Sequence, residues 1–178
     1  AQVRADIEAS MKDQSYTDAG TALERTLRFL AAPSDVNWGG KVHGGTVMRW
    51  IDEAAYVCAA GWNRGPTIAV YAGGVRFYRP LLIGSVVEVQ ARLVHTGRHS
   101  MHISVHVRSG DPKTVERELT THCMMIFVAL DEERRSALVR QWVPVSDEDV
   151  ALDAHARHLI ELRARADLLD RELPRAAR

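Results

Sequence analysis

Apolar and polar side chains alternate along the middle of the chain, between residues 67 and 130. The clearest apolar positions of this alternation are Val87, Val89, Ala91 and Leu93, followed by Met101, Ile103, Val105 and Val107. A period of two is typical of antiparallel strands that have one covered face and one more polar face. Turn residues at 95–99 and 109–112 separate these strands, and Gly73-Gly74 indicates a bulge or a sharp bend. We therefore predict four strands in this region, with a central one at 119–130.

Two other stretches repeat their apolar residues every three or four positions, as amphipathic helices do. The first runs from Thr46 to about Trp62, and its predicted buried face is Val47, Ile51, Ala54, Ala55, Cys58 and Trp62. The second follows Pro144-Val145-Ser146 and three acidic residues, a pattern typical of a capped helix start. Its apolar seam is Leu152, His155, Leu159, Leu162, Ala166, Leu169 and Leu173. This tail helix packs either on its own domain or against another subunit, and the spacing favours neither.

A short strand at 26–30 precedes the first helix, and residues 1–20 form a polar extension without clear periodicity. The order of elements predicts an α+β fold with a five-stranded antiparallel sheet, one long helix and a C-terminal helix. One helix can cover only one face of such a sheet. We therefore expect another subunit to cover the other face and the sheet edges.

Composition narrows the possible classes of function. The chain has 178 residues, with 23 Lys and Arg against 23 Asp and Glu. That length fits one domain, and the missing basic surplus argues against a nucleic-acid partner. No apolar run approaches the roughly 18–20 residues that a membrane-spanning helix needs, and no secretory signal is visible. The two cysteines, Cys58 and Cys123, form no CxxC pair, which fits a reducing cytoplasm.

The segment from Asn37 to Gly45 carries the first candidate chemistry, with four glycines in nine residues. Gly44 and Gly45 immediately precede the first helix. Unpaired amides at a helix N-terminus can bind an anionic or polarised oxygen. A plain glycine N-cap loop is the alternative interpretation.

Asp52 lies one and a half to two turns into this helix, on the same side as Met48 and Ala55. If that side is buried at a subunit seam, partial loss of solvent makes the carboxylate a stronger base. The alternative is a solvated surface cluster with Arg49 and Glu53.

Eight histidines raise the question of a metal site. His102 and His106 share a strand face, but four residues separate them by about 13 Å, too far for one ion to bridge. His95 and His99 flank a turn, while His122, His155 and His158 lack acidic or thiol partners at ligand spacing. His43 touches the glycine loop and stays a candidate for the site, but we expect no metal and no cofactor. No GxSxG elbow, phosphate loop or GxGxxG motif is present.

The run Asn37-(x)5-His43-Gly44-Gly45-(x)6-Asp52-Glu53-Ala54 resembles the hotdog-fold acyl-CoA thioesterases, whose antiparallel sheet wraps around one long central helix. Residues 75–87 resemble the F-x-R-P-x-x-x-G-D-x-V motif of that family, with Ser85 in place of the usual acidic residue. Residues 96–101 resemble its G-x-x-S hairpin. The resemblance covers roughly residues 24–130, and it implies a hotdog domain at 21–135 followed by a linker and helix at 136–178.

The resemblance also implies roles for individual residues. Asp52 is then the catalytic carboxylate, which activates water or attacks the thioester directly. The backbone amide of Gly44, with or without that of Gly45, polarises the thioester carbonyl. Asn37 orients the water or the thioester and faces the Asp of the neighbouring subunit, and His43 shapes the site. The residues implied for coenzyme A binding are Arg79, Arg98, His99 and Ser100.

From this resemblance we expect a cytoplasmic acyl-CoA thioesterase that releases coenzyme A and a carboxylic acid. Coenzyme A is part of the substrate and product. The expected assembly is a homo-oligomer, a dimer at least, with tetramers and hexamers known in the family. A non-catalytic acyl-CoA-binding hotdog protein is one alternative. A hotdog hydratase or dehydratase is another, but it needs an acid/base pair that the sequence does not show.

Overall fold

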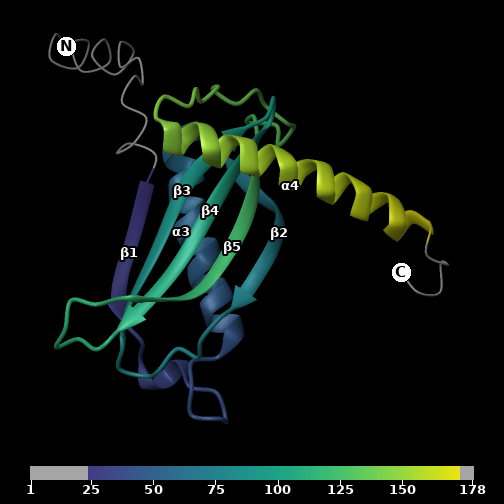
Figure 1. Cartoon of the computed structure of the whole chain (residues 1–178). Coiled ribbons are helices and arrows are strands. Elements are labelled where there is room, and N and C mark those ends of the chain that lie inside the picture. Colours follow the sequence, from purple (N-terminus) through teal and green to yellow (C-terminus); the bar gives the residue numbers. More distant parts are fainter. Residues whose placement is uncertain (1–23, 173–178) are drawn as a thin grey trace, which may run out of the picture.

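The computed structural model describes residues 24–172 and shows one sheet and two long helices in that range. In chain order the elements are β1 (Glu24–Leu30), a short 3-10 turn (Pro33–Asp35), α3 (Gly44–Asn63), β2 (Thr67–Phe77), β3 (Val86–Thr96), β4 (Ser100–Gly110), β5 (Glu118–Ala129) and α4 (Asp147–Glu172). The strands form an antiparallel sheet in the order β1-β3-β4-β5-β2 (Figure 1). This arrangement confirms the predicted fold class. The expected extension at 1–20 lies outside the described residues.

The core lies between the inner face of the sheet and α3. The alternating residues predicted on β3 and β4 are all buried to 0% exposure, from Val87 to Leu93 and from Met101 to Val107. They pack against the predicted helix face, in which Ile51, Ala54 and Ala55 are fully buried. Small side chains on this face let the central strands approach the helix backbone closely.

Helix α3 begins at Gly44, two residues before the predicted start at Thr46. Glycine lowers helix propensity, so the apolar pattern alone hides the first turn. The helix ends at Asn63, and Arg64 then adopts a left-handed conformation with φ of 55°. The predicted end near Trp62 is therefore within one residue.

Strand β2 is an edge strand with irregular pairing. Its register against β5 shifts between Ala69 and Tyr71 and again between Gly73 and Arg76. Gly74 has φ of +63°, and a Cβ atom on Gly73 would collide with the Tyr71 side chain. The bulge predicted at the glycine pair is confirmed, because only glycine fits both conditions.

Helix α4 crosses the outer face of the sheet, on the side opposite α3 (Figure 1). Its Ala156 is 1% exposed and packs with Val94 and Met124, joined by Leu152 and Leu159. The first part of the tail helix therefore packs on its own domain. This corrects the expectation that only another subunit would cover the outer face, because the same chain covers part of it.

The start of α4 is fixed by a buried carboxylate. Asp149 is 2% exposed, and its Oδ1 accepts a hydrogen bond from Arg92 Nη2 at 2.8 Å. Its Oδ2 accepts from the Ser146 amide at 3.1 Å, while Ser146 Oγ accepts from the Asp149 amide. Burial opposes the charged form, but the Ser146 amide and the Arg92 guanidinium outweigh it and lower the pKa of Asp149. The capped start predicted from the sequence is confirmed.

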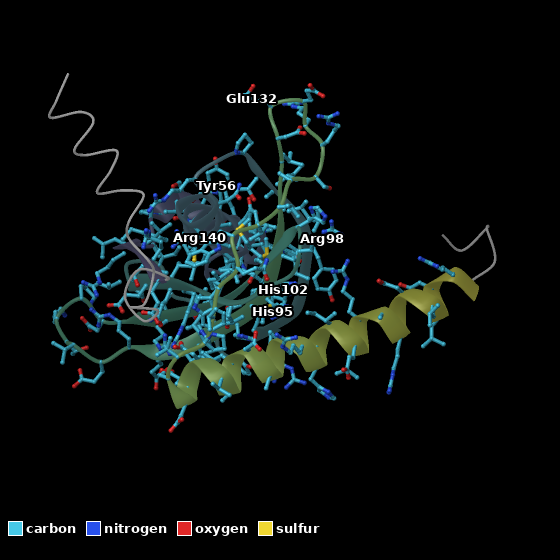
Figure 2. All side chains as sticks on the ribbon, turned by 90° about the horizontal axis from the view of Figure 1, so that it is seen from above. Tyr56, His95, Arg98, His102, Glu132 and Arg140 are labelled. Carbon is cyan, nitrogen blue, oxygen red and sulfur yellow. The ribbon has the colours of Figure 1, made fainter. Side chains whose placement is uncertain are left out.

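Histidines gather on the outer face of the sheet, beneath or beside α4. His95 and His102 meet edge to face with ring centres 5.1 Å apart, and His106 and His122 lie 4.7 Å apart. Figure 2 shows His95 and His102 together next to α4. Burial, and then the charges of His95 and Arg163, lower the pKa of His102 to about 4. The His102 ring is therefore neutral at pH 7.

Between residues 24 and 172, neither helix is long and apolar enough to cross a membrane.

Candidate active site

The start of α3 offers one backbone amide as an unused donor. His43 is the N-cap, and its ring Nδ1 accepts a hydrogen bond from the Gly45 amide at 3.0 Å. The amides of Thr46 and Val47 donate to the His43 carbonyl oxygen at 2.9 and 3.2 Å. The Gly44 amide has no acceptor within the described part of the chain. Of the two glycine amides predicted as carbonyl donors, the structure therefore leaves Gly44 available and Gly45 engaged.

The hydrogen bond from the Gly45 amide also defines which tautomer the neutral His43 ring adopts. Because Nδ1 accepts a hydrogen bond, the neutral ring carries its proton on Nε2. The His43 ring holds the second amide of the helix and leaves the first exposed, and its role in shaping the site stays a prediction. The positive end of the helix dipole lies at the same place.

Gly44 opens into a cavity of about 350 Å³ that Asn37 and Arg79 also line. Phe77 forms the wall beside it, since its Cζ lies 3.7 Å from the place of a Cβ atom on Gly44. The remaining lining residues are Lys41, Val42, Val47, Tyr78, Pro80, Leu81 and Thr121. The structure thus brings Arg79 together with Asn37 and Gly44, which come from one earlier segment of the sequence.

Asn37 is held in one orientation by its own loop. Its Oδ1 accepts hydrogen bonds from the amides of Gly39 at 2.8 Å and Lys41 at 3.1 Å. Two donors on one side-chain oxygen identify that atom as the carbonyl and the other as the amide nitrogen. Nδ2 has no partner among residues 24–172. Asn37 therefore presents a donor whose position the loop fixes.

Asp52 lies apart from this cavity in the same chain. It follows Gly44 by eight residues, or about 12 Å along the helix axis. Arg49 Nη1 pairs with Glu53 Oε1 at 2.8 Å. Of the three residues in the alternative surface cluster, these two therefore form an ion pair without Asp52. Asp52 itself is exposed and has no ion pair or hydrogen bond in the part of the chain that the structure describes.

The residues implied for coenzyme A fall into two places. Arg79 lines the cavity, and its Nη1 pairs with Glu118 Oε2 at 2.9 Å on the surface. The Arg98-His99-Ser100 turn lies at the other end of the sheet, because Ser100 pairs with Val128 while the cavity touches Thr121. Seven strand residues separate those positions by about 23 Å. Within one chain, this turn does not reach the cavity.

The sequence pattern predicts no role at the site for several residues that the structure places there or nearby. Phe77 and Tyr78 belong to a motif that supported the family resemblance, but nothing in the pattern placed them against the helix start. Tyr56, one turn after Asp52, is 50% exposed and lies on the opposite side of the sheet from α4 (Figure 2). Its ring centre is 6.5 Å from that of Phe127. Tyr56 does not line the cavity, and its exposed ring lies on the face of α3 that carries Asp52.

Other chemistries find little support here. Burial raises the pKa of Cys58 to about 12 and that of Cys123 to about 11, so neither thiol is a ready nucleophile. Across residues 24–172, no three His, Cys, Asp or Glu side chains are grouped as a metal ion would require.

Comparison with known proteins identifies the family. The sequence profile of the thioesterase superfamily matches residues 39–116. An uncharacterized acyl-CoA thioester hydrolase of Zymomonas mobilis is 34% identical over 132 residues, which make up 72% of this chain and 86% of that protein. The cytosolic acyl coenzyme A thioester hydrolase of Mus musculus is 32% identical over 59% of this chain and 29% of its own length.

A solved structure agrees with these relatives. The crystal structure of an apo-hexameric acyl-CoA thioesterase has a TM-score of 0.78 and 30% identity, over 82% of this chain and 94% of its own. With its sheet wrapped around α3, the chain therefore belongs to the thioesterase superfamily, as a hotdog-fold member of the acyl-CoA thioester hydrolase family.

Proposed function

We propose that this protein hydrolyses acyl-CoA thioesters to coenzyme A and a carboxylic acid, at sites formed between two copies of the chain. The names of its relatives support the reaction. One observation carries the site: the unused Gly44 amide, at the positive end of α3, shares a cavity with the fixed Nδ2 donor of Asn37.

Thioester hydrolysis builds negative charge on the carbonyl oxygen. The Gly44 amide is placed to donate a hydrogen bond to that oxygen, and one such donor is worth about 2.7–4 kcal/mol in the transition state. Asn37 Nδ2 donates a second hydrogen bond, either to the same oxygen or to the attacking water. Because both donors are held by the backbone, little reorganisation is needed when the charge develops.

Asp52 supplies the carboxylate, from the neighbouring chain. Its distance from Gly44 of about 12 Å along one helix prevents both groups from contacting the same thioester in one chain. The exposed carboxylate, which has no partner among residues 24–172, would lose solvent when a second copy covers this face of α3. It then activates water as a general base, worth about 10²–10⁴-fold, or attacks the carbonyl carbon to form an anhydride.

The coenzyme A portion binds to cationic and polar groups from both chains. Arg79 lies at the cavity, while the Arg98-His99-Ser100 turn comes from the partner, since it lies about 23 Å away in its own chain. The thiolate of coenzyme A is a fairly good leaving group, so the reaction requires neither a strong general acid nor a metal or cofactor.

The protein that performs this reaction is a homo-oligomer, a dimer at least, and it works in the cytoplasm. Exposed apolar side chains on the edge strand and on α3 support the first statement, with Val70 and Tyr56 both 50% exposed. The hexameric solved relative agrees with it. The mouse relative named as cytosolic supports the second.

The decisive variant is Asp52→Asn. We expect kcat to fall by about 10²–10⁴-fold, because the base or nucleophile is lost, while the circular dichroism spectrum, melting temperature and assembly stay unchanged. The matched control is Glu53→Gln, the adjacent exposed carboxylate, which should retain the wild-type rate. An unchanged rate in Asp52→Asn would overturn the assignment.

A thiol reagent distinguishes hydrolysis from mere binding. Release of free coenzyme A from a panel of esters, from acetyl to palmitoyl and including aromatic acyl groups, supports the thioesterase and defines its acyl preference. Tight binding of the esters without thiol release would instead indicate a non-catalytic protein. Loss of 2-enoyl-CoA absorbance without thiol release would indicate a hydratase.

A further inference from the structure

Helix α4 is longer than the surface it covers. Arg92 on β3 contacts Asp149 near the start of the helix, and Tyr71 on the edge strand β2 contacts Arg163, whose guanidinium carbon is 4.2 Å from the ring centre. Between these two contacts the helix crosses the outer face from β3 to β2. Nine residues, 164–172, follow the contact at the edge strand. Both figures show this final part of α4 extending beyond the body of the molecule.

We call residues 164–172 the overhang. At 1.5 Å per residue the overhang is about 13 Å long, which equals about three spacings between neighbouring strands. The overhang continues a longer helix and has no tertiary packing among the described residues, so a partner surface would stabilise it.

The apolar seam of α4 is exposed from Leu162 onward and continues into the overhang. Leu162 is 45% exposed, and in the overhang Leu169 is 65% exposed, with Ala166 between them on the same face. The seam also forms one wall of a cavity of about 620 Å³ between α4 and the sheet, opposite Met124 and Ile126. A partner for this apolar surface would bury both the seam and the cavity wall.

We propose that the overhang crosses the twofold interface and packs on the outer face and the α4 of a second copy, through its Ala166 and Leu169 together with Leu162 just before it. This inference rests on the dimer of the proposed function and adds that the two copies meet along β2, which ends the sheet and exposes Ile68 and Val70. The overhang begins where β2 ends the sheet, so the neighbouring sheet lies directly beneath it. Twofold symmetry then sets the two α4 helices antiparallel, each closing the open side of the other's cavity.

Charge and length favour a second copy over other occupants. The surface to be covered is apolar along the seam, and the overhang reaches about as far as the outer three strands of a neighbouring sheet. The Arg163 guanidinium already lies over the Tyr71 ring, and its Nε is 3.8 Å from Asp167 Oδ2. An anionic ligand is therefore a weaker candidate for this cavity than an apolar helix face.

A pair of cysteine variants tests the proposal directly. Ala166→Cys places a thiol on the seam, three residues past the contact at β2, about 4.5 Å or one strand spacing, where the two helices run side by side. Ala164→Cys places the same group two residues earlier, on the opposite face of the helix. The native cysteines are buried at 4% and 0% exposure, so only the introduced thiol reacts.

We expect oxidation or a short bismaleimide to join two chains through Ala166→Cys and not through Ala164→Cys. Denaturing electrophoresis and peptide mass spectrometry identify the linked residues. An Ala166→Cys thiol that labels freely with maleimide, or one that is protected without linking, overturns the proposal. Protection without linking would indicate another occupant, such as a different part of the same chain.

A second pair of variants tests the energetic role of the seam. Leu162→Glu combined with Leu169→Glu should weaken the assembly at least tenfold in dissociation constant, measured by analytical ultracentrifugation. Leu168→Glu is the control, because this leucine is 58% exposed on the opposite helix face. Equal assembly of both proteins would contradict the inference.

These outcomes separate the two proposals. A dimer with full thioesterase activity but no link through position 166 removes the role of the overhang and leaves the reaction intact. A linked dimer that releases no coenzyme A retains the overhang contact and removes the hydrolase. A chain that stays monomeric at all concentrations removes both the overhang contact and the shared site.

Discussion

At the scale of single residues, the proposed carbonyl donor can be removed without removing the helix that carries it. Gly44 is the first helical residue, a position where proline is tolerated and its φ is suitable. His43 before it is extended, with φ of −66° and ψ of 133°, as a residue preceding proline must be. Gly44→Pro therefore deletes one N–H group and little else.

We expect Gly44→Pro to lower kcat by about 10²–10³-fold, the usual loss for one oxyanion donor. Gly44→Ala is the matched control, since it keeps the N–H and its Cβ would meet Phe77 at an ordinary contact distance of 3.7 Å. Steady-state kinetics on one acyl-CoA compare the two variants. A loss of similar size in both would mean that shape, not the donor, matters at this position.

His102 gives the folded protein a defined sensitivity to acid. Its pKa is lowered from 6.5 to about 4, by burial first and then by His95 and Arg163. The unfolded chain therefore binds the proton more readily than the folded chain, and stability falls as the pH drops from about 6.5 to about 4. The full shift corresponds to a stability loss on the order of 3 kcal/mol.

His102→Gln should reduce this loss. The comparison is the change in free energy of unfolding between pH 7 and pH 4.5, measured by urea titration. His158→Gln is the control, because its side chain is 67% exposed on α4. If His102→Gln retains the wild-type pH dependence, the other outer-face histidines are responsible for it.

At the scale of elements, burial explains what the sequence pattern could predict. Val89 on β3 and Val105 on β4 belong to period-two runs, and both are completely buried against α3. A strand face that packs against a helix is lined by apolar residues, so the alternation of apolar and polar residues predicts which face is buried. The same reasoning gave the buried face of α3, because Ile51 and Ala55 repeat with the helical period.

The position of α4 could not be obtained in this way. Its seam shows that one side is apolar, but the spacing of Leu152 and Leu159 is the same whether that side meets a sheet or another helix. The deciding contact is between Arg92 and Asp149, which are 57 residues apart in sequence. Long-range polar pairs of this kind leave no periodic signal.

Asp149→Ala should loosen the start of α4. The substitution removes a helix cap and leaves the Arg92 guanidinium without its most buried partner, so we expect a loss of about 2–3 kcal/mol in unfolding free energy. Asp147→Ala is the control in the same turn, because its side chain is exposed. Urea denaturation followed by circular dichroism gives both values, and equal stabilities would show that the buried carboxylate is not what fixes the helix.

At the scale of the whole molecule, only part of the candidate site could be predicted. The sequence pointed to Asn37, Gly44 and Asp52, and the structure brings the first two to one cavity. It leaves Asp52 about 12 Å away along the helix. The spacing of residues in a motif does not tell whether they meet within one chain or between two chains. Only the distance between Gly44 and Asp52 in the structure separates these two arrangements.

Mixed dimers test whether the site is shared. Asp52→Asn and Asn37→Asp should each be nearly inactive, and Asn37→Asp keeps the oxygen that accepts the loop amides of Gly39 and Lys41. Half of the dimers formed from an equal mixture contain both variants, and each has one intact shared site. Dissociating and reassociating the mixture should therefore restore about a quarter of wild-type activity.

The controls are each variant taken alone through the same dissociation and reassociation. A mixture that stays inactive while mass spectrometry confirms mixed dimers would place Asn37 and Asp52 in sites within single chains.

The irregular edge of the sheet has a consequence for solubility. Flat, continuous strand edges act as templates on which further chains stack into fibres. On β2 the register breaks near Val70 and again after Gly73, so that edge offers only short runs of unpaired backbone to an incoming chain. The interrupted edge therefore disfavours growth of a fibre by repeated strand addition. A twofold dimer is still possible, because each chain uses its β2 edge in a single contact.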